Sequence, residues 1–365
     1  MRDIDVYYSP LVDSVSRILT GFYMIGQQSN YNVRLHENIV EKNIPDIEVL
    51  EADIDGLRIA FDMGDRWALA HENGRQYLKE VDAYFARDYT TKIDIVTPYV
   101  DADDFKKVFP FGFNYFSTYP GNPLYNKKPS SIKGKIVDAI KYYSGYSRSM
   151  YPEYFEGKAD YKPGNFKILF NTRLWDADSL PPLTDASEEA IAYRNYMVAE
   201  WNTINDSRIK IIRALSAQYG KNFSGGVQHS ALAEKMCPDL ILPTSAVRKK
   251  SYLDQMKSSD ICIGSIGLHK SNSWKTGEYV AAARAIVAEK LYYDVPGDFD
   301  DGNHYIPYTT VEECVEAVDT LYNDPDLVYS MKKANEVYYS LYLKPDVQIM
   351  NAINIAFSNT DLSIK

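Results

Sequence analysis

The stretch Asp260–Leu291, DICIGSIGLHKSNSWKTGEYVAAARAIVAEKL, decides the fold. Its apolar run 261–264 follows polar residues and is typical of a buried parallel strand. A polar loop bracketed by Gly264, Gly267 and Gly277 comes next, and the helical pattern begins at Glu278. A second apolar run, 285–288, predicts the following strand. The order is therefore strand, glycine-bearing polar loop, helix and strand, which is the repeating unit of an α/β protein.

The loop between these two strands carries side chains that suit a phosphate. A helix N-terminus presents unpaired N–H groups and a partial positive charge, and the loop adds cations and hydroxyls at Lys270, Ser273, Lys275 and Thr276. We place Glu278 in the first helical turn, where its carboxylate could accept hydrogen bonds from a ribose. A structural alternative stays open, in which Ser273 or Thr276 caps the helix and Glu278 complements its dipole.

The motif Ser-x-Lys-Thr-Gly-Glu-Tyr at 273–279, followed by a small-residue helix and Ala-Ile-Val at 285–287, resembles the donor-binding segment of group 1 GT-B-fold glycosyltransferases. In that family a glutamate at this helix start holds the ribose of a nucleotide sugar, and Glu278 matches its position. The resemblance also implies a nucleotide-sugar-binding role for Gly277 and the loop side chains. Retaining members usually carry another glutamate eight residues earlier. This chain has Lys270 there, so the resemblance does not extend to the stereochemistry.

The resemblance implies an α/β fold with two Rossmann-like domains that face each other across a cleft. We expect residues 1–160 to form the acceptor domain, 161–345 the donor domain, and 346–365 a helix that crosses back to the first domain. The implied partners are a nucleotide-sugar donor and a glycan, lipid-linked or other hydroxyl acceptor, as in polysaccharide biosynthesis. No cofactor is implied. The oligomeric state stays unknown.

The rest of the chain fits two α/β halves. The apolar run 4–8, an amphipathic helix beginning near residue 14 and the run 31–35 predict a βαβ opening with a parallel sheet, and further strands are expected at 57–61, 83–86 and 93–96. A strong buried strand at 166–170 restarts the pattern, and two helices are predicted from residues 186 and 206. A chain of 365 residues has the length of two ordinary domains.

Composition narrows the function classes. A net charge of −10 argues against nucleic acid or an anionic membrane as the main partner of the whole chain. The three cysteines are widely spaced and form no metal-ligand pattern, which favours a reducing compartment. We found neither an apolar signal region nor a stretch long enough to span a membrane. The expected location is the cytoplasm, with peripheral contact to a membrane left open.

Three further residues are candidates for the donor site. Arg173 directly follows the strand 166–170, where a cation could stabilise the diphosphate that departs in a transfer reaction. The resemblance supports this role through an arginine at the end of the first strand of the donor domain. Arg208 could turn inward from its helix, and Tyr252, which comes before residues 258–260, resembles the tyrosine that precedes the Ala-Asp strand of this fold. The alternatives are an exposed ion pair with Asp176 or Asp178 for Arg173, surface charge for Arg208 and core packing for Tyr252.

The acceptor's catalytic base should come from the first half of the chain. In an inverting transfer a carboxylate removes the proton of the attacking hydroxyl. Asp13 follows the first strand, and Asp62 and Asp65 follow the strand 57–61, so all three could lie at the carboxyl edge of the sheet. As alternatives, Asp13 could cap a helix and Asp62 could serve a turn.

The sequence also bears on metal dependence and on two rival functions. Asp-x-Asp occurs at 53–55, 101–103 and 176–178, but none follows a convincing strand of a nucleotide-binding domain, so we expect no metal site. A sugar-nucleotide epimerase of the same fold would need acids and a histidine near the donor sugar, for which His229 and His269 are available. A non-catalytic subunit that binds a nucleotide or glycan is the rival of another class.

Overall fold

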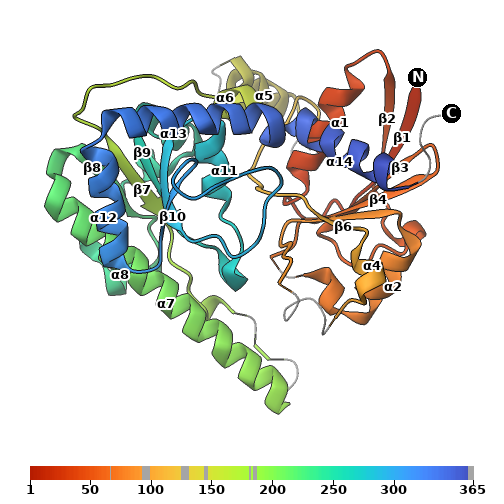
Figure 1. Cartoon of the computed structure of the whole chain (residues 1–365), viewed down its shortest axis with the longest axis horizontal. Coiled ribbons are helices and arrows are strands. Elements are labelled where there is room, and N and C mark those ends of the chain that lie inside the picture. Colours follow the sequence, from red (N-terminus) through yellow and green to blue (C-terminus); the bar gives the residue numbers. More distant parts are fainter. Residues whose placement is uncertain are drawn as a thin grey trace.

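The computed structural model describes residues 1–65, 67–92, 99–124, 131–143, 147–180, 182–183 and 187–360. Two sheets organise this part of the chain, and each has helices on its faces (Figure 1). The fold is α/β with two Rossmann-like domains, as expected. The strand that we predicted at 93–96 lies outside the described residues.

The first sheet has six strands within the described residues, in the order β2-β1-β3-β4-β5-β6. Their bounds are β1 Arg2–Tyr7, β2 Tyr31–His36, β3 Val49–Ile54, β4 Leu57–Asp62, β5 Ala83–Ala86 and β6 Val108–Pro110. The helix α1, Ser16–Gly26, joins β1 to its parallel neighbour β2, which gives the predicted βαβ opening. The other helices before the second sheet are α2 Glu72–Glu80, α4 Ala102–Phe105, α5 Ile132–Tyr143 and α6 Pro152–Phe155.

The βαβ opening favours a parallel sheet, and most of the described strand pairs are parallel, but β3 runs antiparallel to both of its neighbours, so the first sheet is mixed. Strand β3 forms a hairpin with β4 through the two-residue turn Asp55-Gly56, in which both residues have a positive φ, 54° and 90°. The strand was missed because Glu51 interrupts its apolar pattern. Glu51 is nevertheless fully buried, since it pairs with Arg58 and accepts a hydrogen bond from Tyr77 Oη at 2.7 Å.

The second sheet is entirely parallel over its described strands, in the order β11-β10-β9-β7-β8. Its strands are β7 Ile168–Thr172, β8 Phe223–Val227, β9 Ile261–Gly264, β10 Ala285–Glu289 and β11 Ile306–Tyr308. The switch point lies between β7 and β9, because the chain places β8 on one side of β7 and then continues with β9 on the other side. Open α/β sheets bind ligands at the carboxyl ends of the strands at such a switch point.

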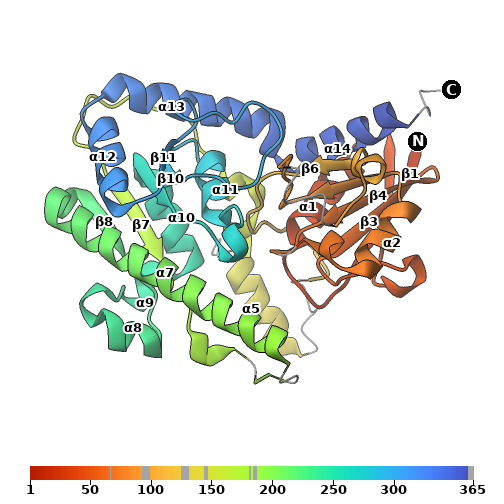
Figure 2. The ribbon, with the colours of Figure 1, turned by 60° about the horizontal axis from the view of Figure 1, so that its bottom comes forward.

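The helices of the second domain cover both faces of this sheet (Figure 2). They are α7 Glu188–Tyr219, α8 Ala231–Met236, α9 Thr244–Val247, α10 Lys249–Ser258, α11 Trp274–Ala281, α12 Val311–Tyr322 and α13 Pro325–Tyr338. The two helices predicted from 186 and 206 were wrong, since α7 is one continuous helix of 32 residues. The chain between them, near Asn202 and Asn205, contains no glycine or proline that would end a helix.

The last helix, α14 Pro345–Asn359, leaves the second domain and packs on α1 (Figures 1 and 2). Its buried residues Ile349, Ala352, Ile353 and Ala356 belong to the apolar core that lies against the first sheet. Arg17 of α1 is buried at this junction. Its guanidinium donates to the carbonyl of Leu343 and to Gln348, and it lies over the ring of Tyr115 at 4.4 Å. Helix α14 is thereby part of the first domain.

A buried ionic network lies at the end of the second sheet where the central strand β9 begins. Asp260 accepts from Lys332 of α13 at 3.0 Å and from Lys162 at 2.8 Å. It also accepts from the backbone N–H of Lys167 at 2.9 Å. Burial opposes the charge of Asp260, but these hydrogen bonds and cations lower the pKa of its carboxyl overall. The network therefore ties the start of β9 to α13.

Candidate active site

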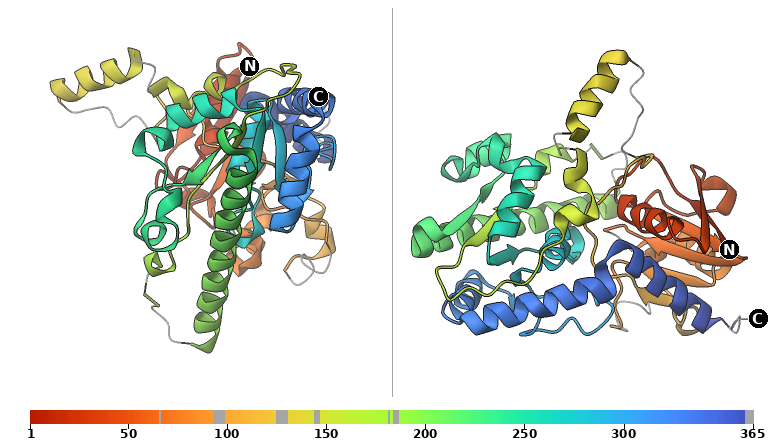
Figure 3. Two further views of the ribbon diagram at one scale, coloured as in Figure 1. Left: turned by 90° about the vertical axis from the view of Figure 1, so that its left-hand side faces the viewer. Right: turned by 90° about the horizontal axis from the view of Figure 1, so that it is seen from above.

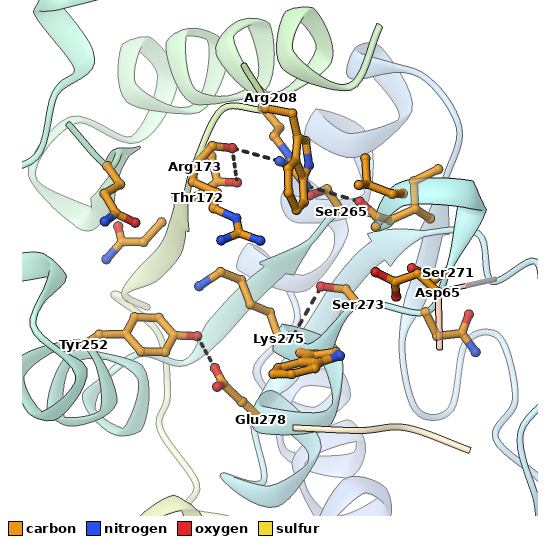
Figure 4. Close-up of a pocket in the computed structure, with 18 of the residues that line it drawn as sticks. Asp65, Thr172, Arg173, Arg208, Tyr252, Ser265, Ser271, Ser273, Lys275 and Glu278 are labelled. Carbon is orange, nitrogen blue, oxygen red and sulfur yellow. Dashed lines mark hydrogen bonds between the residues drawn. The ribbon is translucent and has the colours of Figure 1, made fainter. Parts of the chain in front are cut away.

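A pocket of about 460 Å³ lies at the switch point of the second sheet (Figure 4). Residues that follow β7 and β9 form its floor, the start of α11 forms one wall, and α10 contributes another. Of the described residues that line the pocket, Asp65 comes from the first domain. The residues used below are Asp65, Arg173, Trp175, Arg208, Lys249, Tyr252, Ser265, Ser273, Lys275 and Glu278. The pocket thus lies on the second domain and faces the first.

Two arginines form the cationic floor. Arg208 turns inward from α7 and donates to Ser265 Oγ at 3.0 Å, to the carbonyl of Arg173 at 2.8 Å and to that of Ile266 at 3.2 Å. Burial lowers its pKa to about 10, so it stays charged at neutral pH. Arg173 lies 4.2 Å from the ring centroid of Trp175, and burial lowers its pKa as well. The negative charge of Asp65 raises the pKa of Arg173 and so opposes this effect of burial. Asp65 and Arg173 therefore attract each other across the cleft.

Glu278 is the centre of a second, mixed-charge group. Its carboxylate accepts from Tyr252 Oη at 2.8 Å and from Lys249 Nζ. Burial disfavours ionisation, but the charges of Lys249 and Lys275, together with these hydrogen bonds, lower its pKa overall. Lys275 lies 4.0 Å from the ring centroid of Tyr252, and burial lowers the pKa of its ammonium to about 8. The group therefore holds one carboxylate between two lysines.

The helix α11 begins earlier than we predicted. Ser273 is its N-cap, and Ser273 Oγ accepts from the N–H of Lys275 at 3.3 Å, so the capping role considered for this serine is present. The helix starts at Trp274, and Glu278 consequently lies in the second turn. The placement of Glu278 in the first turn was wrong because the polar run 271–276 conceals the helix start in the sequence. The carboxylate nevertheless faces the pocket (Figure 4).

Three of the predicted donor residues lie elsewhere. Lys270 is exposed, and its ammonium lies 4.7 Å from the ring centroid of Tyr292. Thr276 is buried behind β9, beside Gly264. Gly277 faces the segment between the domains, where an added Cβ would lie 2.9 Å from the carbonyl oxygen of Asn114. Gly277 is thus required for close packing of α11, and neither it nor Thr276 lines the pocket.

The three acids of the first domain have different surroundings. Asp65 lines the pocket, is about half exposed and is paired with Arg87. Asp62 is buried and accepts from Tyr84 Oη at 2.8 Å and from the N–H groups of Gly64 and Ala68, both at 3.1 Å. Burial raises its pKa to about 6. These bonds give it the turn-holding role that was its alternative.

Asp13 is exposed, and it does not line the pocket. Its backbone carbonyl accepts from the N–H of Ser16 at the start of α1. The structure therefore brings Asp65 to the pocket and leaves the other two predicted acids outside it.

Several residues around the pocket were missed in the sequence. Lys249 lies three residues before Tyr252 on α10, and this spacing places both on one helix face, a signal that could have revealed it. Trp175 and Ser265 follow strand ends, as Arg173 does. Asp88 is buried next to Arg87, with 3.5 Å between Arg87 Nε and Asp88 Oδ1, and burial raises its pKa to about 7. Its carboxylate helps to fix the arginine that pairs with Asp65.

Metal ligands and histidines are scarce around the site. Within the described ranges, no group of three or more histidine, cysteine or acidic side chains has the arrangement of a metal site. His229 is exposed beside Glu234, and His269 stacks on Tyr193, so neither of them lines the pocket. None of the described helices is long and apolar enough to cross a membrane.

The architecture is that of the GT-B fold, which confirms the fold expected from the sequence. Two Rossmann-like domains flank a cleft, the candidate pocket lies at the switch point of the second, and the final helix returns to the first. No protein-family model matches the chain, and no curated protein matches it. The known proteins to which it is similar are solved structures.

These similarities are distant. The chain is 10% identical to MnaA of S. aureus, solved with UDP, with 98% of each chain covered and a TM-score of 0.44. A UDP-GlcNAc 2-epimerase from Neisseria meningitidis, bound to UDP-GlcNAc, is 10% identical, with 96% of this chain and 98% of that one covered and a TM-score of 0.41. The C-terminal domain of the group 1 glycosyl transferase LpcC from Francisella tularensis is 11% identical, with 53% and 97% covered and a TM-score of 0.35. The residues of the site therefore carry the evidence for function.

Proposed function

We propose that the protein is a metal-independent glycosyltransferase that moves a sugar from a nucleotide-sugar donor to a hydroxyl acceptor, such as a glycan or a lipid-linked saccharide. One observation carries the proposal: the switch-point pocket gathers Arg173, Arg208, Lys249 and Lys275 around the single carboxylate Glu278 on the donor side. Among the described residues that line the pocket, these four cations outnumber the two acids, Glu278 and Asp65, and this excess of positive charge suits a diphosphate. The pocket volume also lies in the range of small-molecule sites.

The donor would bind with its phosphates towards Arg173 and Lys275 and its ribose towards Glu278. Both oxygens of Glu278 already accept one hydrogen bond each, and each retains a lone pair for a ribose hydroxyl. As the bond to the sugar breaks, the nucleoside diphosphate gains negative charge, and the fixed cations stabilise that charge more than they stabilise the intact donor. Arg208 acts mainly by positioning Ser265 and the backbone at Arg173.

Asp65 is the candidate for the acceptor's base. It reaches the pocket from the first domain, so an acceptor bound there would lie between Asp65 and the donor sugar. A carboxylate in this position can take the hydroxyl proton as the oxygen attacks the anomeric carbon. Arg87, held in turn by Asp88, keeps this carboxylate oriented. An inverting reaction would follow from direct attack.

The donor site is tested with Glu278→Ala in a thermal-shift screen of UDP, GDP, CMP and dTDP, with and without Mg²⁺. We expect one nucleotide to stabilise the wild type without metal, and saturation at a hundred times its Kd corresponds to about 2.7 kcal/mol. The variant should lose most of that shift because the ribose loses its acceptor. Glu153→Ala, which removes an exposed carboxylate on α6 outside the pocket, should keep it. No shift with any nucleotide at millimolar concentration would reject the proposed donor site.

The role of Asp65 is tested with Asp65→Asn in an assay of nucleoside diphosphate release from nucleotide sugars over a panel of saccharide acceptors. Loss of a general base should reduce turnover by about 10²- to 10⁴-fold. The nucleotide-dependent thermal shift should be unchanged, since Asp65 is not on the donor side. Asp13→Asn serves as the matched control and should turn over normally. Equal turnover in both variants would exclude Asp65 as the base.

A further inference from the structure

The helix α5, Ile132–Tyr143, projects away from the body of the molecule (Figure 3). It lies in the segment that joins the two sheets, and it packs on the short helix Ser147–Met150. Its aliphatic side chains are exposed to an unusual degree: Ile132 is 79% exposed, Ile136 56%, Val137 41% and Ile140 63%. A helix that carries this much aliphatic surface outside the core is typical of a docking element.

The exposed aliphatic residues form one stripe. Residues four apart lie above one another on a helix, so Ile132, Ile136 and Ile140 share a face, with Val137 beside it. The stripe therefore runs over two turns along a helix that stands clear of both domains (Figure 3). Isolated exposed aliphatic residues are ordinary, but a periodic stripe on a projecting helix is the pattern of a surface that is covered in the working protein.

The segment around α5 has the opposite charge to the rest of the chain. The chain carries a net charge of −10, yet residues 125–148 contain six cations and one acid, Asp138. The cations are Lys127, Lys128, Lys133, Lys135, Lys141 and Arg148. A helix that combines an aliphatic stripe with several lysines is complementary to a surface that has negatively charged groups on its outside and an apolar layer beneath them.

We propose that α5 lies in the headgroup region of an anionic membrane, with its isoleucine stripe in the acyl boundary and with the net positive charge of residues 125–148 attracted to the lipid phosphates. Neither attraction suffices alone, and the two together give reversible peripheral attachment. A second copy of the helix is a poorer occupant because two cationic segments would repel each other. Nucleic acid would leave the isoleucine stripe uncovered. The proposal requires no nucleotide and is independent of the proposed function.

The test is flotation of the full-length protein with vesicles of phosphatidylcholine, alone or with about a third phosphatidylglycerol, followed by quantification of the bound fraction. We expect binding to the anionic vesicles and little binding to the neutral ones. The variant Ile136→Asp/Ile140→Asp should reduce the partition coefficient by about tenfold or more because charged residues replace the inserted stripe. Lys133→Gln/Lys135→Gln/Lys141→Gln should weaken binding and make it insensitive to salt.

The matched control is Leu11→Asp/Val40→Asp, which changes two aliphatic residues of the first domain that are 78% and 80% exposed. It should float as the wild type does. Unchanged melting temperatures would show that all the variants are folded, which is expected for exposed positions. The proposal is overturned if the wild type does not bind anionic vesicles, or if the control loses binding as strongly as the α5 variant. It is also overturned if light scattering shows a dimer that Ile136→Asp/Ile140→Asp dissociates.

Discussion

Replacing Lys275 with methionine is expected to stabilise the ligand-free protein and, at the same time, to weaken nucleotide binding. The ammonium of Lys275 is largely buried among Tyr252, Lys249 and Arg208, and burial lowers its pKa from 10.5 to about 8. A charged lysine in that position costs the folded state about 1–3 kcal/mol, which a methionine of similar shape would avoid. The same change removes a cation from the phosphates and should weaken nucleotide binding by about 10- to 100-fold.

The lowered pKa of Lys275 also predicts how the unfolding free energy changes with pH. Since the folded pKa lies below the unfolded one, the unfolded state binds more protons between about pH 8 and 10.5, and this lysine makes stability rise with pH over that window. The variant's advantage in unfolding free energy should therefore be full at pH 7 and shrink towards pH 10.5. Denaturant unfolding at several pH values measures it. Lys270→Met, in the same loop but exposed, should change neither stability nor binding. A Lys275→Met protein that is less stable at pH 7 would contradict this account.

Replacing Lys332 with methionine is expected to destabilise the protein by about 3–5 kcal/mol. Lys332 is fully buried and lies 3.0 Å from Asp260 and 3.1 Å from Asp160. Its loss leaves Asp260 with Lys162 as its remaining ammonium partner, and a buried carboxylate that loses its main partner is costly. Because Asp260 begins the strand that carries the pocket loop, nucleotide affinity should decline as well.

Urea unfolding at pH 7 measures this loss, with Lys333→Met as the neighbouring control on the exposed side of α13. The pKa of Asp260 is lowered in the folded state, so its contribution to stability is present above the unfolded pKa of 3.8 and is lost as the pH falls through the folded one. The difference between wild type and Lys332→Met should therefore diminish in acid. Asp260→Asn/Lys332→Met should recover part of the loss. Equal stability of Lys332→Met and Lys333→Met would refute the network's role.

The second domain was predictable because its sheet is parallel and buried on both faces. Such strands are continuous apolar runs, and the predicted bounds of β9 agree with the structure. The strands of the first domain were harder to predict, because β3 contains the buried acid Glu51, a residue type that is more typical of loops. The Asp55-Gly56 turn between two apolar runs was a usable hairpin signal. The continuous α7 was missed because the polar residues around Asn205 and Asp206 in its middle resemble a helix boundary, although no residue there breaks a helix.

Candidate site residues were predictable where a strand end or a helix start places them. Arg173, Lys275 and Glu278 were found from such positions, and all three line the pocket. Lys249 could have been found from its spacing to Tyr252 on α10, whereas the position of Arg87 depends on how separate elements pack, which a single sequence does not reveal. Lys270 and Thr276 were selected by their chemistry, but the left-handed backbone at residue 270 and the burial of Thr276 direct them elsewhere. Local sequence patterns locate the loop that lines the pocket, but tertiary packing determines which of its side chains face the pocket.

The return of α14 to the first domain has a consequence for synthesis on the ribosome. The first domain is translated first, yet Ile349, Ile353 and Ala356 complete its apolar core. A nascent chain that has emerged only as far as β6 exposes the apolar surface that α14 will cover, including residues of α1. The order of translation and the order of folding are therefore uncoupled. The first domain completes its tertiary structure only after α14 has left the exit tunnel.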